Sequence, residues 1–435
     1  MLFAAALIIA GAIAPMVKRV DVRLVLLGSG FLMALLAGTP LVIADSFTRG
    51  MVAAMVAPIC ASMGFAALMH ATGCDHHLVH ALLSPVRRFR WFVLPGGILS
   101  AYIVNMAVPS QASTAAVLGP ILVPLILASG RPPAVAGAAL ILGASFGGDL
   151  LNPGAQDVQA VAATAGLSAA ELSARVIPAN LAGALVAAIV FTLLNWRRSE
   201  ADTELTAPVV PTTTDELTLR VNPLKAAIPA VPIVLLLAGY AHWHGFAWLV
   251  TPPPGDEWRP LASALPVVRA MLVGAVLAIV VAWREVLTLT RAFFDGMGSA
   301  YAGIISLTIS AQCFGAGVAA IGLANALLQR ASASDALIPL AAGFPWGLSV
   351  LSGSGSGPIL AFAQTFLTQV SASDKPVVLG AMACLGGAFG RTMSPVSAVV
   401  VYGSGLVGAQ PFAVIRRLLP ALLAGGAVAI GVALR

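Results

Sequence analysis

Three ionisable residues lie within strongly apolar sequence, where such residues are rare. Asp149 and Asp157 belong to Gly143–Asp157, which reads GASFGGDLLNPGAQD, and Arg391 belongs to Gly386–Pro395, which reads GGAFGRTMSP. A charge at membrane depth is costly and is by default a functional-site hypothesis. A guanidinium matches a carboxylate through two hydrogen bonds, and a buried carboxylate can carry a proton. The pattern therefore predicts that Arg391 binds a carboxylate, with Asp149 first and Asp157 second as ion-coupling residues.

Two interpretations fit Arg391 and Asp149, and they are not exclusive. In the first, the guanidinium binds the substrate. In the second, the two side chains form a permanent structural ion pair, because the internal repeat described below places them at nearly equivalent positions.

Two tips rich in Ser and Gly supply further groups that could bind an anion. They are 109–114 (PSQAST) and 352–358 (SGSGSGP). A helix that starts at such a tip presents unpaired N–H groups, so two opposed tips could hold both ends of a dianion. The plainer interpretation is that small residues let the arms pack closely. The candidate substrate-binding residues are Ser110, Ser113, Thr114, Asn152, Ser352, Ser354, Ser356, Arg391, Thr392 and Ser394.

The elements that position these residues are two interrupted apolar segments, 134–163 and 376–402. In the first, Gly147-Gly148 and Asn152-Pro153-Gly154 should break the helix at mid-depth, because proline removes a donor and glycine weakens a helix. Gly386-Gly387 begins the corresponding pattern in the second segment. Unwound backbone at membrane depth is tolerated only where protein buries it or a cavity adjoins it, and paired breaks of this kind form transporter sites.

Composition places the whole chain in a membrane. Of its 435 residues, 59% are hydrophobic and only 9% are charged, whereas soluble domains average about 25% charged residues. The prediction is an all-α polytopic membrane protein with about 10 transmembrane helices plus two re-entrant hairpins, built as inverted-topology repeats with discontinuous helices. The expected spans are 2–17, 22–44, 51–72, 134–163, 176–195, 224–242, 262–283, 297–321, 376–402 and 412–433.

An internal repeat organises the chain into two halves. The FTRGM of 47–51 matches the FDGM of 294–297, tip matches tip, and the spacing between matching positions is constant from Ser113 and Ser356 to Gly147 and Gly390. The predicted units are N-terminal helices at 1–46, a first repeat at 47–195 with hairpin 91–129 and broken helix 134–163, a cytoplasmic linker at 196–223, helices at 224–293, and a second repeat at 294–435 with hairpin 336–370 and broken helix 376–402.

Basic residues predict the orientation. If the loop that holds Lys18, Arg19 and Arg23 is cytoplasmic, most Lys and Arg residues fall on the cytoplasmic side, as the positive-inside rule requires. Both termini are then outside, 75–90 lies along the cytoplasmic face as an amphipathic helix, and 323–335 lies along the periplasmic face. The two repeats are then inverted.

Other chemistry is weakly indicated or absent from the sequence. His76 and His80 have a metal-ligand spacing beside Asp75 and His77, but interfacial helices carry such histidines freely, so no metal is expected. The sequence has no nucleotide-binding loop and no histidine near either break, so neither ATP-driven transport nor enzymatic catalysis is expected. The net charge of +6 reports membrane orientation, and no nucleic-acid partner is expected.

Four segments resemble a known family. FGGDLLNPGAQD, AQCFGAGVAAIGL, LSGSGSGP and FGRTMSPVSAV are similar to segments of the anaerobic C4-dicarboxylate carriers of the DcuC type, within the ion transporter superfamily. The resemblance implies transport of succinate, fumarate or malate by an elevator motion, usually as a homodimer. In that superfamily each tip carries a Ser-Asn-Thr triplet that helps to hold sodium and a substrate carboxylate. This chain has Ala112-Ser113-Thr114 and Gly355-Ser356-Gly357, without the asparagine.

The sequence thus predicts a multi-pass secondary transporter for a small dicarboxylate in a bacterial inner membrane, working by exchange or by cation-coupled symport or efflux. The coupling ion is H⁺ or Na⁺, and the missing asparagines favour H⁺. The alternatives are a carrier for another carboxylate or an amino acid and, less well supported, an ion channel, because hairpins with Gly-Ser tips also form filters.

Overall fold

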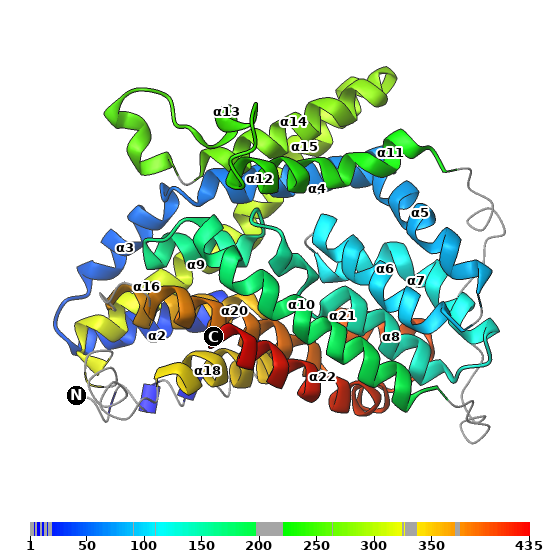
Figure 1. Cartoon of the computed structure of the whole chain (residues 1–435). Helices are drawn as coiled ribbons and strands as arrows, with labels where there is room; N and C mark the ends of the chain where they lie inside the picture. The colour runs from blue at the N-terminus through cyan, green and yellow to red at the C-terminus, as the bar shows by residue number, and fades with distance from the viewer. Residues whose placement is uncertain are drawn as a thin grey trace.

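The computed structural model describes residues 20–89, 91–108, 110–196, 221–262, 264–323, 337–369 and 375–435, with a few isolated positions. Every regular element in these residues is a helix (Figure 1). Most of the expected first span at 2–17, most of the predicted linker and nearly all of the amphipathic segment expected at 323–335 lie outside the described residues, as does Pro109 of the first tip.

The described helices make the chain a polytopic membrane protein. Seven of them are long and apolar enough to cross a membrane, or eight if α3 (Leu41–Met51) and α4 (Val56–Thr72), which meet at 51°, count as one span. Four shorter apolar helices accompany them. The sequence predicted about ten spans. Part of the difference lies in the expected span 22–44, which is divided between α2 (Val22–Leu36) and α3.

One layer of helices lies along the top of Figure 1 and is called the α4 layer here. Its helices pack on one another around a core of their own that includes Phe65, Leu68 and Leu236. It consists of α4, α12 (Val231–Tyr240), α14 (Leu265–Val281) and α15 (Val286–Ala300), with the short α11 (Pro223–Ala227) and α13 (Ala247–Val250) at its edges.

The larger part of the molecule, called the hairpin body here, surrounds a second core. Large, fully buried side chains such as Phe146, Leu140 and Phe362 fill this core. Its helices are α6 (Val93–Ala107), α7 (Gln111–Ala128), α8 (Pro133–Ser145), α9 (Gln156–Ala165), α10 (Ala169–Leu194), α18 (Leu337–Ser352), α19 (Ser356–Phe366), α20 (Lys375–Met393), α21 (Ala398–Leu406) and α22 (Pro411–Ala433).

Several connections among the described residues join these parts, including a hydrogen bond from the Ser62 hydroxyl of α4 to the carbonyl oxygen of Gly154 at 3.0 Å. Helix α5 (Cys74–Arg88) leaves the α4 layer and packs against α6 and α7, and its residues Leu78, Val79 and Leu83 belong to the core of the hairpin body. Helices α2 and α16 (Ser306–Ala320) form a third cluster, which reaches α19. The three cores are therefore separate clusters joined by a few helices.

The first break is where the sequence predicted it. Helix α8 ends at Ser145, Gly147 has a φ of 93°, and a 3₁₀ turn follows at Gly148–Leu151 before α9 begins at Gln156. A positive φ is strained for any residue with a Cβ, so Gly147 makes this turn possible. Asp149 thereby lies on a 3₁₀ turn between two α-helices inside the hairpin body.

The second break lies at the end of the Gly386–Pro395 pattern. Helix α20 runs without interruption through Gly386-Gly387 to Met393, and the chain leaves the helix only at Ser394–Ser397. The segment 376–402 is therefore interrupted at the Ser394-Pro395 end of the predicted pattern, and the glycine pair lies within intact helix. The glycine instead allows close packing, because a Cβ on Gly386 would lie 2.2 Å from the carbonyl oxygen of Ala342 in α18. Arg391 consequently projects from an intact last turn.

Both predicted hairpins are helix pairs with short non-helical tips. Helices α6 and α7 flank the first tip, and α18 and α19 flank the second. In each pair the returning helix starts at the tip, so its free N–H groups are there, as the sequence predicted. The orientation of the chain in the membrane and the inverted relation of the two repeats stay predictions.

Replacing Gly386 by Ala should destabilise the hairpin body, because the new Cβ would collide with the α18 backbone. We expect a cost of about 1–3 kcal/mol, as overpacking in a core typically has. Thermal unfolding of the purified protein in detergent measures it. Gly431→Ala is the matched control, since that glycine lies within α22 with open space around its Cβ position. Equal unfolding temperatures for the two variants would contradict the packing role of Gly386.

Candidate functional site

Arg391 and two carboxylates form a buried ion cluster inside the hairpin body. The Nη2 atom of Arg391 lies 2.8 Å from each of the two carboxylate oxygens of Asp149, and its Nη1 atom lies 3.5 Å from Oδ2 of Asp157. The three residues are 4%, 3% and 2% exposed, in the order Arg391, Asp149, Asp157. Charges with so little access to water are stable only when they are paired. The three residues that the sequence singled out are thus in one site.

Asp149 is held from several directions. Gln111 donates a hydrogen bond from Nε2 to Oδ2 of Asp149 at 2.8 Å, and the backbone N–H of Asp149 donates to Oδ1 of Asn105 at 2.9 Å. Gln111 is the first residue of α7, so the first tip contacts the ion cluster directly. Removing a proton acceptor from this network would leave buried donors without partners, which is costly.

Asp157 is held less completely. Its Oδ1 atom is buried and has no hydrogen-bond partner among the described residues, and the same is true of Nε of Arg391. Each such group costs free energy unless something else satisfies it. Within the described part of the chain, the cluster therefore has one unused acceptor and one unused donor next to its ion pairs.

The two broken helices are clamped together around the cluster. The rings of Phe146 and Phe389 stack with centroids 4.8 Å apart, and the hydroxyls of Ser145 and Thr392 lie 2.9 Å apart. Thr392 therefore serves the clamp, since its hydroxyl also approaches the carbonyl oxygens of Ser145 and Ala388. These contacts place the end of α8 beside the last turns of α20, which fixes Asp149 against Arg391.

The second tip also reaches the cluster. A Cβ on Gly355 would lie 2.7 Å from Cδ of Arg391, so the tip backbone packs directly against that side chain. Gln156, next to Asp157, donates from Nε2 to the hydroxyl of Ser356 at 3.3 Å. Ser356 is the first residue of α19. The start of this hairpin arm is therefore beside the ion cluster.

Several predicted substrate-binding residues have local structural roles. Thr114 donates to the carbonyl of Val108, and Asn152 donates to the carbonyl of Met106. The remaining members form turns or caps: Ser110 caps α7 and contacts Ser113, Ser352 accepts from the N–H of Ser354, and Ser394 accepts from the N–H of Val396.

Sequence reasoning missed three polar residues of the site. Gln111 and Asn105 contact Asp149, and Gln156 contacts Ser356 beside the cluster, yet none was chosen as a candidate. Gln111 and Gln156 belong to the PSQAST and NPGAQD segments, and an amide in an apolar segment is itself an unusual and costly feature. That signal could have identified them.

The ion pair should show strong energetic coupling. Asp149→Asn or Arg391→Gln alone leaves a buried charge without its main partner, which costs about 3–5 kcal/mol in buried pairs. We expect the double variant to lose less stability than the sum of the two singles, as measured by thermal unfolding in detergent. Additive losses would show that the pair is not the stabilising contact that the geometry implies.

Comparison with known proteins identifies the family. The model of the DcuC family, described as C4-dicarboxylate anaerobic carriers, matches residues 35–434. A Haemophilus influenzae protein named only as an uncharacterized transporter is 27% identical over 280 residues, which are 63% of this chain and 96% of that protein. A Vibrio cholerae protein named a probable anaerobic C4-dicarboxylate transporter DcuC is 26% identical over 382 residues, which are 85% of this chain and 79% of that protein.

The fold has a counterpart among solved structures. A crystal structure of the Alcanivorax borkumensis YdaH transporter, reported to have an unusual topology, aligns with a TM-score of 0.62 at 19% identity, over 97% of this chain and 98% of that one. This likeness concerns the fold alone, whereas the family match extends over nearly the whole sequence. The chain belongs to the DcuC family of C4-dicarboxylate anaerobic carriers.

Proposed function

We propose that the chain is a secondary active carrier of C4-dicarboxylates such as succinate, fumarate and malate, and that Arg391 binds one substrate carboxylate. The observation that carries this proposal is the buried guanidinium between two carboxylates, where the ends of both broken helices and both hairpin tips meet. A guanidinium pairs with a carboxylate in a planar, two-bond geometry. A substrate carboxylate can therefore replace Asp149 as the partner of Arg391.

The net charge of the ion cluster indicates that a cation must accompany the substrate. One guanidinium and two carboxylates leave the closed cluster with a net negative charge when both acids are ionised. A dianionic substrate would add two further negative charges to a region nearly without water, where repulsion between like charges is strong. Positive charge must therefore enter with the substrate. We propose that protons supply it.

The geometry favours Asp157 as the residue that takes up the proton. Asp149 would have to give up two short contacts to Arg391 and one to Gln111. Asp157 has a longer 3.5 Å contact to Arg391, an interaction with the Ser356 hydroxyl, and one oxygen without a hydrogen-bond partner among the described residues. Sequence reasoning ranked Asp149 first, because only the structure shows how differently the two acids are held. Asp149 is then the residue that neutralises Arg391 when no substrate is bound.

An elevator motion of the hairpin body past the α4 layer is the mechanism we propose. The cores of these two parts support it, because they are separate clusters apart from Ile233 of α12, which belongs to the core of the hairpin body. A body with its own core can move without unfolding. The cluster must also open, since its residues are almost completely buried. We also propose that the carrier works as a homodimer in the bacterial inner membrane. This part of the proposal is based on the resemblance to the family.

Arg391→Lys should weaken binding of succinate-like ligands by about 1–3 kcal/mol, or roughly 5- to 150-fold, because lysine keeps the charge but loses the planar fork. Isothermal titration of the purified protein with succinate and fumarate measures this change. Arg416→Lys is the control, since Arg416 lies on the exposed face of α22. If Arg391→Lys binds succinate as tightly as the wild type, Arg391 does not bind the substrate carboxylate. Tighter binding of an amino acid than of succinate by the wild type would favour the alternative function, a carrier for amino acids.

Asp157→Asn should abolish succinate accumulation driven by a pH gradient in proteoliposomes, while exchange of internal for external succinate continues. An amide cannot take up the proton, but it leaves the Arg391–Asp149 pair intact. Asp149→Asn should impair both activities, because it disturbs the partner of Arg391. Uptake by the wild type that follows a sodium gradient at fixed pH would overturn proton coupling and favour a cation held at the tips.

A further inference from the structure

A sharp corner between α4 and α5 brings three potential metal ligands together. Helix α4 ends at Thr72, Gly73 adopts the left-handed conformation with a φ of 67°, and α5 begins at once with Cys74. This corner places His70, from the last turn of α4, beside Asp75 and His76 in the first turn of α5. His70 could not be selected from the sequence, because its proximity to Asp75 depends on this reversal of the chain.

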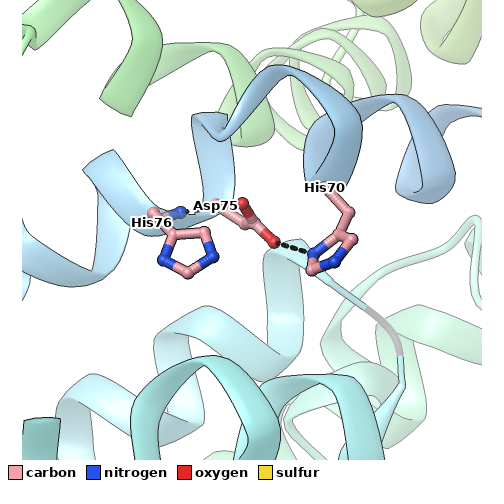
Figure 2. Close-up of side chains that lie close together, drawn as sticks. All are labelled: His70, Asp75 and His76. Atoms are coloured by element: carbon pink, nitrogen blue, oxygen red, sulfur yellow. Dashed lines mark hydrogen bonds and ion pairs between the residues drawn. The ribbon is translucent and has the colours of Figure 1, made fainter. Parts of the chain in front are cut away.

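The three side chains converge closely. Figure 2 shows the imidazoles of His70 and His76 on either side of the Asp75 carboxylate. Nδ1 of His70 lies 3.0 Å from Oδ2 of Asp75, and one potential ligand atom from each of the three residues lies within 4.8 Å of the others. The Asp75 side chain is 3% exposed, whereas that of His70 is 70% exposed. The carboxylate is therefore fixed, and an ion could approach from the side of His70.

We propose that His70, Asp75 and His76 bind a divalent first-row transition-metal ion such as Zn²⁺. Two imidazoles and one carboxylate form a common ligand set for these ions, with further positions left to water. The orienting contact of the carboxylate is also present, because Oδ1 of Asp75 accepts a hydrogen bond from the backbone N–H of His76 at 2.8 Å. Such contacts hold a ligand in position for the metal.

The required rearrangement is small. Two ligands about 2.1 Å from one ion at a tetrahedral angle are about 3.4 Å apart. Because all the ligand atoms lie within 4.8 Å of one another, no separation would have to shrink by more than about 1.4 Å. Rotation of the exposed His70 ring and the partly exposed His76 ring can supply this without moving the backbone. The ion would replace the His70–Asp75 hydrogen bond.

This site differs from the one that spacing along the helix indicated. His76 and His80 are one helical turn apart, but His80 is not in the cluster that the structure shows. His77 is engaged elsewhere, since its Nδ1 accepts from the N–H of Asn222. The metal would join the end of α4 to the start of α5, the helix that connects the α4 layer to the first hairpin. It would stiffen this corner.

Titration of the EDTA-treated full-length protein with ZnCl₂ in detergent tests the proposal. We expect one saturable Zn²⁺ site per chain and a higher unfolding temperature with the ion, since a ligand that binds only the folded state stabilises it. His70→Ala and His76→Ala should each weaken binding by roughly 10-fold or more. Because His70 is exposed at the end of its helix, His70→Ala should fold normally, and thermal unfolding without metal checks this.

His77→Ala and His242→Ala are matched controls and should bind Zn²⁺ like the wild type. Co²⁺ in place of Zn²⁺ gives a visible spectrum that should change in His70→Ala and not in His77→Ala. No saturable binding of either ion to the wild type would overturn the proposal, as would equal binding by His70→Ala and the wild type. The test needs no transport, so it stands independently of the proposed substrate.

Discussion

The structure depends on keeping one arginine charged where water hardly reaches. A buried guanidinium is tolerable only if anionic partners and hydrogen-bond acceptors replace the water that it has lost. Asp149 supplies the closest partner and Asp157 a looser one. Much of the surrounding architecture serves this requirement, including the turn at Gly147, the stack of Phe146 on Phe389 and the tips of both hairpins.

This constraint also explains how a closed cluster could serve transport. A buried ion pair contributes less to stability than its geometry implies, because desolvation offsets most of the attraction. A carboxylate ligand can therefore exchange with Asp149 at a small net cost, whereas loss of one partner without replacement is expensive. In the proposed mechanism Asp149 is the main partner of Arg391 in the empty site, and in the occupied site a substrate carboxylate takes its place while Asp157 carries a proton. A carrier needs this balance, because it must return without its cargo.

Much of this could be predicted from the sequence, and the reasons for the exceptions are physical. Asp149, Asp157 and Arg391 were identifiable because charge is rare in apolar sequence, and Gly147 because it accompanies Asn152-Pro153 in one short stretch. The role of Gly386 was not identifiable, because glycine in a helix signals either a break or close packing, and the choice depends on the neighbouring helix.

Contacts between distant parts of the chain explain the other misses. Gln111 matters because the first tip folds back onto the turn that holds Asp149. His70 joins Asp75 because α4 and α5 reverse at Gly73. The choice between Asp149 and Asp157 as the proton carrier also depends on contacts between distant parts of the chain, because the two carboxylates are chemically alike and differ only in their surroundings. Spacing along the sequence predicts which residues share a turn or a helix face. It does not predict which distant segments of the chain meet in the folded protein.

A structure of the protein with succinate bound would test whether Arg391 binds the substrate. A succinate carboxylate should lie within hydrogen-bond distance of the Arg391 guanidinium, with Asp149 no longer bonded through both oxygens to Nη2. Succinate bound elsewhere, with the Arg391–Asp149 pair unchanged, would instead make the cluster a purely structural element.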